Sequence, residues 1–464
     1  MIEHIPSSVL DITKTFSDHG YSIYLVGGSV RNILLKRAVK DWDFTTNATP
    51  PEIQSLFPDS FYDNTFGTVG IVINKDTPEQ TVIEVTTFRT EHGYSDSRHP
   101  DSVSWGKTIG EDLSRRDFTV NAMAIDMKNV QGSSINTVEQ LPSLLIDPFK
   151  GHLDLTKKLI RAVGNPEERF KEDALRLMRA IRFATQLEFS IEKSTLEAIV
   201  EDSSLLEKIA QERIRDELIK ILASEHPFDG IMLLKNTGLL KYILPELLEG
   251  IGVSQKRPGR HHTTDVFEHN VFSLKFCPSH DPIVRFATLI HDVAKPRVAS
   301  KDKDGYVIFH NHEIVGSKMA YTICDRLRLS KKDREKVVKL IRWHMFTVDE
   351  HITDSAVRRF IRRVGVENVK DMMDLRIGDR LGGGTQTAES WRLKLFKKRV
   401  EEQLAPAPFS INDLAIDGND IMKELDMKPG RKIGELLQQL FEEVDEDLSK
   451  NTKDYLLSRI KDLS

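Results

Sequence analysis

The sequence predicts an α+β protein, with a small mixed α/β region over residues 1–150 and an all-helical remainder over residues 151–464. In the first region, short β-prone runs such as residues 70–74 and 81–85 alternate with helical runs. Beyond Asp147-Pro-Phe and Gly151, which favour a domain boundary, apolar residues recur at helical spacing. A chain of 464 residues is also long enough to hold several domains.

The composition is that of a soluble globular protein, with 39% hydrophobic and 30% charged residues. No signal-like segment and no apolar run long enough to span a bilayer is present, so we expect a cytoplasmic protein without a membrane partner. Cys277 and Cys324 are the only cysteines, and their spacing fits neither a disulfide framework nor a metal motif. The net charge of −5 argues against a uniformly basic nucleic-acid coat but permits local basic surfaces.

A glycine turn and a pair of aspartates lie near the start of the chain. The β-prone run 24–26 ends at Gly27-Gly28 and a helical pattern follows, an arrangement in which backbone N–H groups can approach a phosphate. Asp41 and Asp43 lie two apart in a second β-like run, so their carboxylates share one face and favour a hard cation such as Mg²⁺. A plain turn and a solvated surface are the alternatives. Glu84 is either a third acidic group at this place or an exposed strand residue.

Two polar stretches follow within the first region. Residues 87–100 contain Gly and Pro without a clear period, which predicts a long loop of the kind that often acts as a lid. Arg115 and Arg116 then precede an apolar helical run. A guanidinium group suits a triphosphate because it is always charged and donates paired hydrogen bonds. Surface ion pairs with Asp112 or Asp117 are the alternative.

The segment 169–184 predicts an amphipathic helix with a stripe of charged residues. An apolar side is formed at helical spacing, and the charged stripe recurs every three residues as Asp173, Arg176, Arg179 and Arg182. A carboxylate only accepts hydrogen bonds and a guanidinium only donates them. A fixed Asp173–Arg176 pair would therefore match the Watson–Crick edges of cytosine and adenine and oppose those of guanine and uracil. A solvated i,i+3 salt bridge is the plainer interpretation.

The order of these motifs resembles the class II CCA-adding enzymes, which are tRNA nucleotidyltransferases related to bacterial poly(A) polymerases. The resemblance covers residues 20–250. It rests on the following segments: Gly27-Gly-x-x-Arg31, Asp41-x-Asp43, Arg115-Arg-Asp-Phe-Thr-x-Asn-Ala122, Asp147-Pro-Phe-x-Gly-x-x-Asp-Leu155, Glu172-Asp-x-x-Arg176 and Gln211-Glu-Arg-Ile-Arg-x-Glu-Leu218. It implies a nucleotidyltransferase head over 1–150, a helical neck over 151–225, a helical body over 226–262 and a helical tail over 386–464.

By this resemblance Asp41 and Asp43 bind Mg²⁺, and Gly28 and Arg31 contact the triphosphate. The incoming CTP or ATP is held by Arg116, Asp173, Arg176, Arg179 and Arg182. The implied activity is addition of C74, C75 and A76 to tRNA without a nucleic-acid template. Phe66-Gly-Thr-Val-Gly70 stands where poly(A) polymerases carry a basic-aromatic run, and the filled stretch 87–103 disfavours a CC-only enzyme. An A-adding enzyme or a poly(A) polymerase remains the alternative.

A second constellation of possible metal ligands lies at 263–385. His269, His291-Asp292 and Asp379, with Lys295 after the pair, resemble the HD phosphohydrolase domain. His312 and His344 stand where two-metal members carry further ligands. Such a cluster suits Mn²⁺, Ni²⁺, Fe or Mg²⁺, and its substrate would be a phosphomonoester or a 2′,3′-cyclic phosphate. A degenerate structural domain is one alternative. A phosphohydrolase with an inert head is the rival function of another class.

Two basic helical stretches remain, at residues 358–363 and 392–399. Each could meet tRNA phosphates or form a solvated helix face. Residues 411–463 predict amphipathic helices with a turn at Pro429-Gly430 and carry no catalytic signal.

Overall fold

The computed structural model describes residues 5–39, 41–63, 67–77, 80–92, 102–106, 108–128, 130, 137–255, 264–346, 348–349, 351–404 and 410–463. The chain divides into two compact units, Met1–Pro245 and Glu246–Ser464. This division falls within the range 226–262 that the sequence analysis assigns to a single helical body. The expected α+β class, a mixed α/β region followed by helices, is confirmed.

Unit 1 begins with a seven-stranded mixed sheet of order β3-β4-β5-β2-β1-β8-β9. The pair β2–β5 is parallel, and the other neighbouring pairs of this sheet are antiparallel. The strands are β1 (Ile23–Val26), β2 (Phe44–Thr46), β3 (Ser60–Asp63), β4 (Thr68–Ile73), β5 (Thr81–Thr87), β8 (Ala124–Asp126) and β9 (Leu145–Ile146).

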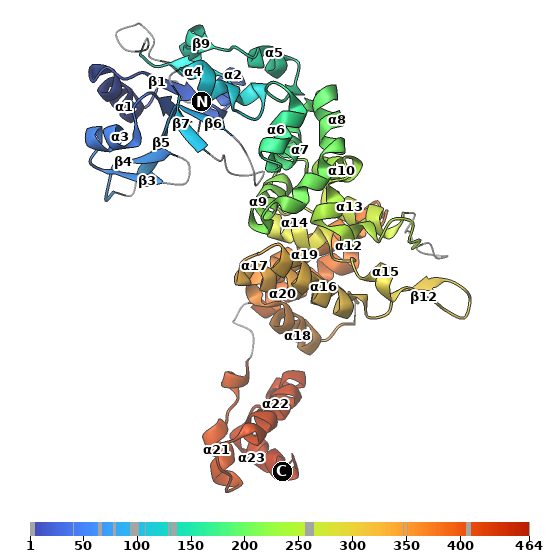
Figure 1. Ribbon diagram of the computed structural model, residues 1–464. Helices are drawn as coiled ribbons and strands as arrows, with labels where there is room; N and C mark the ends of the chain where they lie inside the picture. Colours follow the sequence, from blue (N-terminus) through green and yellow to red (C-terminus); the bar gives the residue numbers. More distant parts are fainter. Residues whose placement is uncertain are drawn as a thin grey trace. The chain divides into compact units, whose positions relative to one another are not determined.

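The expected strands at residues 70–74 and 81–85 are present as β4 and β5. In β5 the side chains alternate, with Ile83 and Val85 buried and Glu84 exposed, as a strand with one covered face requires. The helices and 3-10 turns around the sheet are α1 (Ser7–Asp18), α2 (Gly28–Leu34), α3 (Pro50–Leu56), α4 (Ile109–Ser114), η1 (Thr119–Asn121) and η2 (Val138–Leu144). Figure 1 shows α1 and α3 beside the sheet, where they contact β1, β3 and β4.

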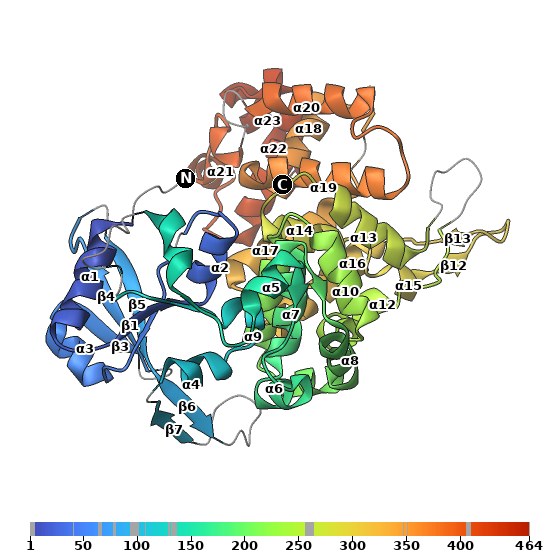
Figure 2. The same ribbon diagram turned by 90° about the horizontal axis from the view of Figure 1, so that it is seen from above.

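The stretch 87–100, expected to be a loop without regular structure, instead takes part in a hairpin of β6 (Arg89–His92) and β7 (Ser102–Trp105). Strand β6 consists of polar residues only, so it lacks the alternation by which a strand is recognised. The hairpin lies beside α4 (Figure 2). Residues 93–101 and Phe66, on which part of the loop and poly(A) arguments depended, lie outside the described residues.

The rest of unit 1 is mainly helical, as expected, but also contains the short parallel strand pair β10–β11. Its elements are α5 (Gly151–Thr156), β10 (Leu159–Ile160), α6 (Pro166–Glu172), α7 (Leu175–Leu187), β11 (Ser190–Ile191), α8 (Lys193–Glu201), η3 (Ser203–Lys208), α9 (Gln211–Leu222), α10 (Pro227–Asn236), α11 (Leu240–Ile243) and α12 (Pro245–Leu248), which ends in unit 2. Helix α7 packs against α9 and α10 and buries the expected apolar side: Leu175, Met178, Ala180, Ile181 and Ala184.

Unit 2 is a helical assembly in which α13 packs along α19 and α16 packs along α17. Its first part consists of α13 (Val266–Phe276), α14 (Pro282–Leu289), α15 (Lys295–Val298), β12 (Ser300–Lys301), β13 (Val307–Ile308), α16 (His312–Arg326), α17 (Lys331–Trp343), α18 (Asp354–Val364), η4 (Val366–Asn368) and α19 (Val369–Gly382). Both cysteines lie here, buried and unbridged.

The last part of unit 2 consists of α20 (Trp391–Leu404), η5 (Ile411–Asp413), α21 (Gly418–Glu424), α22 (Arg431–Glu446), η6 (Leu448–Lys450) and α23 (Lys453–Leu463). The turn at Pro429-Gly430 precedes α22, and the apolar faces of the last three helices enclose their own core around Leu440 and Ile460. Within the described part of the chain, none of the helices combines the length and apolar character that a bilayer crossing requires.

Candidate functional sites

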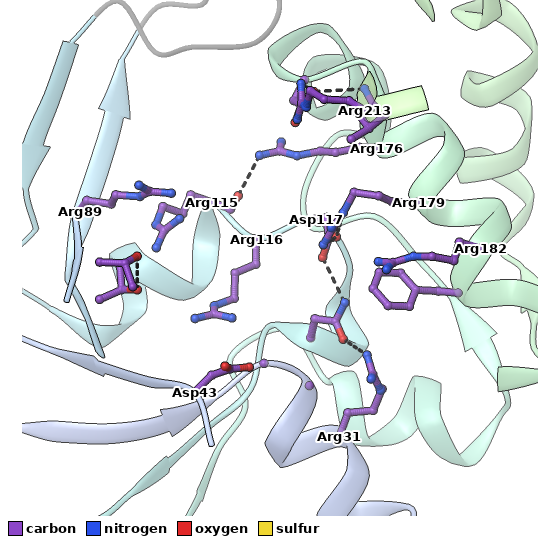
Figure 3. Close-up of a pocket in the computed structure, with 18 residues that line it drawn as sticks. Arg31, Asp43, Arg89, Arg115, Arg116, Asp117, Arg176, Arg179, Arg182 and Arg213 are labelled. Carbon is purple, nitrogen blue, oxygen red and sulfur yellow. Dashed lines mark hydrogen bonds and ion pairs between the residues drawn. The ribbon is translucent and has the colours of Figure 1, made fainter. Parts of the chain in front are cut away.

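The first site is a pocket of about 530 Å³ in unit 1, between the glycine turn of the head and helix α7. Eight arginines and three aspartates line it, so positive charge predominates. In Figure 3, Arg176, Arg179 and Arg182 reach the pocket from α7, while Arg89, Arg115 and Arg116 come from the head. The full lining is Gly27, Gly28, Arg31, Asp43, Thr68, Thr86, Arg89, Arg115, Arg116, Asp117, Asn121, Asp173, Leu175, Arg176, Arg179, Arg182, Phe183 and Arg213.

The expected strand–turn–helix forms the floor of this pocket. Strand β1 ends at Val26, and α2 begins at Gly28. Gly27 has a φ of +68°, which favours glycine, and a Cβ there would lie 2.9 Å from an Nη atom of Arg116. The turn therefore admits the Arg116 guanidinium directly over the backbone.

The two aspartates differ in their placement. Strand β2 begins only at Phe44, so Asp41 and Asp43 lie in the irregular segment before it rather than within a strand. Asp43 is half-buried and lines the pocket, whereas Asp41 is exposed and does not line it. The segment is fixed by Ser29, which donates to the Asp41 carbonyl at 2.6 Å and accepts from the Asp43 N–H at 3.2 Å.

The surroundings of Asp43 favour a cation. Burial raises the pKa of its carboxyl, Glu84 and Asp41 raise it further, and Arg116 and Arg31 oppose the shift. The register Phe44↔Val85 places Glu84 on the neighbouring strand at the level of Asp43. Carboxylate oxygens that repel one another in this way are the donor set that hard divalent ions prefer.

Arg31 carries a charge that the protein does not fully compensate. It donates to Asn121 Oδ1 at 2.5 Å. Burial lowers the pKa of Arg31 to about 10; Asp117 opposes this shift, and Arg182 and Arg179 add to it. An anion bound in the pocket would favour the charged form of Arg31 and so oppose this lowering of its pKa.

Asp117 fixes one of the helix arginines. Arg179 donates to its Oδ2 at 2.8 Å through Nε and at 2.5 Å through Nη2, and Asn121 donates to its Oδ1. Burial raises the pKa of Asp117, but Arg179 and these hydrogen bonds outweigh burial and lower it to about 2. Asp117 and Asn121 belong to the motif at 115–122, in which the sequence suggested Asp117 only as an ion-pair partner of Arg115 or Arg116 and gave Asn121 no role.

The predicted pairing of Asp173 with Arg176 is wrong. The segment 169–184 is two helices rather than one, because Asp173 is extended between α6 and α7 and its Oδ1 accepts from Leu175 N–H at the start of α7. Asp173 binds Arg213 of α9 in a bidentate ion pair of 2.8 and 3.2 Å. Arg176 binds Glu172 at 2.5 Å instead. Both Asp173 and Arg176 nevertheless line the same pocket.

Three further arginines of the pocket are also held by carboxylates. Arg115 and Arg116 both bind the fully buried Asp112, the ion pair that the sequence analysis weighed as the alternative to phosphate binding. Arg182 binds the buried Glu217 at 2.9 Å. Because the pairing carboxylates hold the side chains in place, the guanidinium groups are preorganised around the pocket.

Arg89 and Arg213 line the pocket without having been predicted. Arg89 lies in the unexpected hairpin, and Arg213 lies 40 positions from its partner Asp173. The only sequence signal near Arg213 was the motif at 211–218, which was used for the family resemblance because of its position in the order of motifs.

The second site brings together all six ligands expected in unit 2. His269 lies on α13, His291 and Asp292 follow α14, His312 begins α16, His344 ends α17 and Asp379 lies on α19. They form two groups with ligand atoms within 4.8 Å of one another: His269, His291 and Asp379, and then Asp292, His312 and His344. Asp292 lies between the groups, with Oδ2 3.2 Å from His269 Nε2 and Oδ1 3.3 Å from His312 Nε2.

Three histidines of this cluster are held in one tautomer. The Nδ1 atoms of His291, His312 and His344 lie 2.7–2.8 Å from the carbonyl oxygens of Thr288, Phe309 and Ile341, respectively. A carbonyl only accepts, so Nδ1 carries the proton and Nε2 of each ring presents a lone pair when the ring is neutral. The Nε2 atoms of His312 and His344 lie 3.3 Å apart. Two lone pairs at this distance form no hydrogen bond.

These distances fit a metal ion. Ligand atoms about 2.1 Å from a metal stand about 3.0–3.5 Å from one another, and several pairs of this cluster are separated by 3.2–3.6 Å. Asp292 Oδ1 is buried without a hydrogen-bond partner. The cavity of about 420 Å³ beside the cluster is also lined by Lys295 and Arg376, which bind Asp292 and Asp379.

Three family models match the chain. The Poly A polymerase head domain matches residues 23–161, an RNA and SrmB-binding site of polymerase A matches residues 188–250, and domain 2 of tRNA nucleotidyltransferases matches residues 307–460. The first two together contain the pocket of unit 1 apart from Asp173, Leu175, Arg176, Arg179, Arg182 and Phe183.

Curated relatives and solved structures agree with these models. A CCA-adding enzyme of Ligilactobacillus salivarius is 31% identical over 100% of this chain and 98% of its own length. A CCA-adding enzyme of Lactobacillus helveticus is 42% identical, but this match covers only 50% of this chain and 53% of the relative. The Bacillus stearothermophilus CCA-adding enzyme, solved with CTP, is 24% identical and shares the fold with a TM-score of 0.72 over 98% of each chain. The chain belongs to the family of the CCA-adding enzymes.

Proposed function

We propose that the chain adds C74, C75 and A76 to the 3′ end of tRNA, taking CTP and ATP in turn without a nucleic-acid template. The arginine pocket of unit 1 is the observation that carries this proposal, because it combines the glycine turn, a half-buried carboxylate and eight arginines. The 3′-hydroxyl of the tRNA attacks the α-phosphorus and pyrophosphate leaves. Arg31 and Arg116, beside the turn at Gly28, are suited to hold the leaving phosphates.

Membership of this nucleotidyltransferase family implies dependence on a divalent metal, and we propose Mg²⁺ held by Asp41 and Asp43. The raised pKa of Asp43 and the neighbouring Glu84 fit this role, and Glu84 is a candidate for a third ligand. When bound, two Mg²⁺ ions supply the activation of the hydroxyl and the neutralisation of charge that phosphoryl transfer needs.

We assign base selection to Asp173 and Arg176, supported by Arg179 and Arg182. Asp173 offers an acceptor and Arg176 a donor in one pocket. Asp173 is paired with Arg213, and Arg176 is paired with Glu172. The two side chains are therefore held in place independently and do not form an ion pair with each other. A base that opposes like groups there would lose roughly 1–3 kcal/mol for each unsatisfied buried group.

The experiment that tests the first activity uses tRNAs that end before C74, after C75, and complete, each with one labelled triphosphate at a time. We expect C addition to the first, A addition to the second and none to the third. A addition alone would establish the A-adding alternative, and long A tails would establish a poly(A) polymerase. Asp41→Ala should abolish every product, and substantial residual addition would contradict the metal assignment.

A second candidate function, metal-dependent phosphohydrolysis, is favoured by the histidine cluster of unit 2. His269, His291, Asp292 and Asp379 would hold one metal, with His312 and His344 completing a second position. Lys295 and Arg376 border the same cavity and are suited to bind the phosphate of a phosphomonoester or a 2′,3′-cyclic phosphate. Mn²⁺, Ni²⁺, Fe or Mg²⁺ would supply a nucleophilic hydroxide at neutral pH.

The test of this second activity offers RNA ends with a 3′-phosphate or a 2′,3′-cyclic phosphate to the full chain with each of these metals. Release of phosphate or opening of the ring that is lost in Asp292→Asn would support the proposal. Hydrolysis without any nucleotide addition would instead identify a phosphohydrolase with an inert head. No hydrolysis with any of the four metals would leave the cluster a structural one.

A further inference from the structure

A strip of arginine and aromatic side chains borders the cavity of about 420 Å³ beside the histidine cluster of unit 2, which we call the histidine cavity. Two hollows of about 350 and 390 Å³ adjoin at Phe346, which lines both. The first shares Met345 with the histidine cavity and the second shares Arg376 with it. We call the following set the arginine–aromatic strip: Trp343, Phe346, Arg359, Arg363, Trp391 and Arg392.

The arginines of α18 divide between two faces of the helix. Arg358 and Arg362 both bind the buried Asp445 of α22 and are therefore structural. Arg359 and Arg363 share another face, are exposed, and line the first hollow. No carboxylate among the residues that the structure describes lies within ion-pair distance of either. The basic stretch at 358–363 thus combines a structural pair with a pair whose charge faces solvent.

The aromatic part of the strip combines a packed ring, Phe346, with an exposed one, Trp391. Phe346 packs against Phe360 and Phe396 at ring distances of 4.7 and 5.3 Å. Trp391 is 58% exposed, an unusual cost for so large an apolar side chain. The guanidinium of Arg392 lies 5.3 Å from its ring centre, and that of Arg363 lies 4.7 Å from the ring centre of Trp343.

We propose that the arginine–aromatic strip binds single-stranded RNA and directs its 3′ end to the histidine cavity. Guanidinium groups bind backbone phosphates, and tryptophan faces stack with bases that are free of a partner strand. The base faces of duplex RNA are stacked on one another, so a duplex could contact only the arginines of the strip and not its tryptophans. An acidic peptide would leave the exposed Trp391 without a matching group. The delivery of an end to the cavity rests on the second activity proposed above, whereas the binding itself does not.

The first test measures the affinity of the full chain for a fluorescent eight-nucleotide RNA of mixed sequence. We expect Arg359→Glu/Arg363→Glu to weaken binding at least tenfold and to flatten the salt dependence, since each phosphate contact in a single strand contributes a slope of about 0.7. The matched control is Arg431→Glu/Lys432→Glu, which makes the same change of charge at exposed positions of α22 and should bind like the wild type.

A second variant separates stacking from charge. Trp391→Leu keeps every arginine and should weaken the RNA about five- to a hundredfold, the range measured for one base stacked on an aromatic side chain. It should leave the salt slope unchanged. Equal affinities of both double variants, or full competition by a duplex of the same length or by a poly-glutamate peptide, would overturn the proposal.

A hydrolysis measurement tests whether the strip directs an RNA 3′ end to the histidine cavity. The strip variants should raise the KM for an RNA 3′-phosphate at least tenfold and leave the turnover of a small phosphomonoester unchanged. An unchanged KM for the RNA would overturn delivery. If the wild type hydrolyses neither compound, the second activity and delivery fail together, while the binding measurements still decide whether the strip holds RNA.

Discussion

The two candidate sites hold charge in opposite ways. In the pocket of unit 1, each of several arginines is fixed by a carboxylate beside or behind it, as Arg179 is by Asp117 and Arg182 is by Glu217. In the cavity of unit 2, ring nitrogens and carboxylates converge on one another, and backbone carbonyls fix three of the rings from behind. The first arrangement offers donors to a large anion. The second offers lone pairs to a small cation.

The contrast between the two sites shows that a shifted pKa has to be interpreted together with the positions of the neighbouring groups. Arg31 and Asp43 are both half-buried, and burial shifts the pKa of each in the direction that favours its neutral form. Among the described residues, however, groups of three ligand atoms close enough for one ion occur only in unit 2. A triphosphate with its own ions would bring the missing charges to the unit 1 pocket, whereas in unit 2 the possible ligand atoms already lie together.

The largest effect that would test this comparison is expected at Asp43. Asp43→Asn keeps the shape of the side chain but removes the charge that we propose holds Mg²⁺, so nucleotide addition should fall at least about a thousandfold, equivalent to about 4 kcal/mol of transition-state stabilisation. Metal binding by unit 2 should not change. The measurement is single-turnover addition of labelled CTP to a tRNA that ends before C74, with the exposed Asp18→Asn as control. Residual addition near the wild-type rate would mean that the pocket acts without this carboxylate.

The converse variant is His291→Gln. It removes one converging nitrogen, so the affinity of unit 2 for Mn²⁺ or Ni²⁺ should fall at least about a hundredfold, while nucleotide addition stays at the wild-type rate. Titration calorimetry with each metal checks the first half, and the addition assay checks the second. His280→Gln, which alters an exposed histidine outside the cluster, is the matched control. If His291→Gln binds metal as tightly as the control His280→Gln, the converging histidines do not form a metal site.

Local features of these sites were predictable from the sequence, and long-range pairings were not. The turn at Gly27-Gly28 follows from residues adjacent in the chain, and helix periodicity identified the buried side of α7. The six side chains that gather in unit 2 were picked out by residue type and order, through the resemblance to the HD domain. The ion pair of Asp173 with Arg213 joins residues 40 positions apart, which no spacing rule could indicate. The β6–β7 hairpin was missed because β6 is polar throughout and shows no alternation.

The corrected partner of Asp173 leads to a smaller, selective effect. If Arg213 fixes the carboxylate that accepts from the base, Arg213→Ala should relax discrimination among the four triphosphates about five- to a hundredfold, within the 1–3 kcal/mol cost of an unsatisfied buried group. Asp173→Ala should do at least as much. Arg215→Ala, two positions away on the same helix, should keep the selectivity. The readout is the ratio of kcat/KM values for CTP and UTP, and an unchanged ratio in both site variants would remove base selection from these residues.

The smallest effect concerns the stability of unit 1 at low pH and depends on the buried carboxylate of Asp117. The folded-state pKa of Asp117, about 2, lies below its ordinary value of 3.8. Its stabilisation is therefore present above about pH 4 and lost as the pH falls towards 2. The shift corresponds to about 2 kcal/mol. Denaturant unfolding at pH 6 and pH 2.5 should show this loss in the wild type but not in Asp117→Asn, which is already weakened at pH 6 because Arg179 is left without its partner. An equal loss in both proteins would mean that other carboxylates govern the acid sensitivity of unit 1, and that Asp117 serves only to position Arg179 beside the pocket.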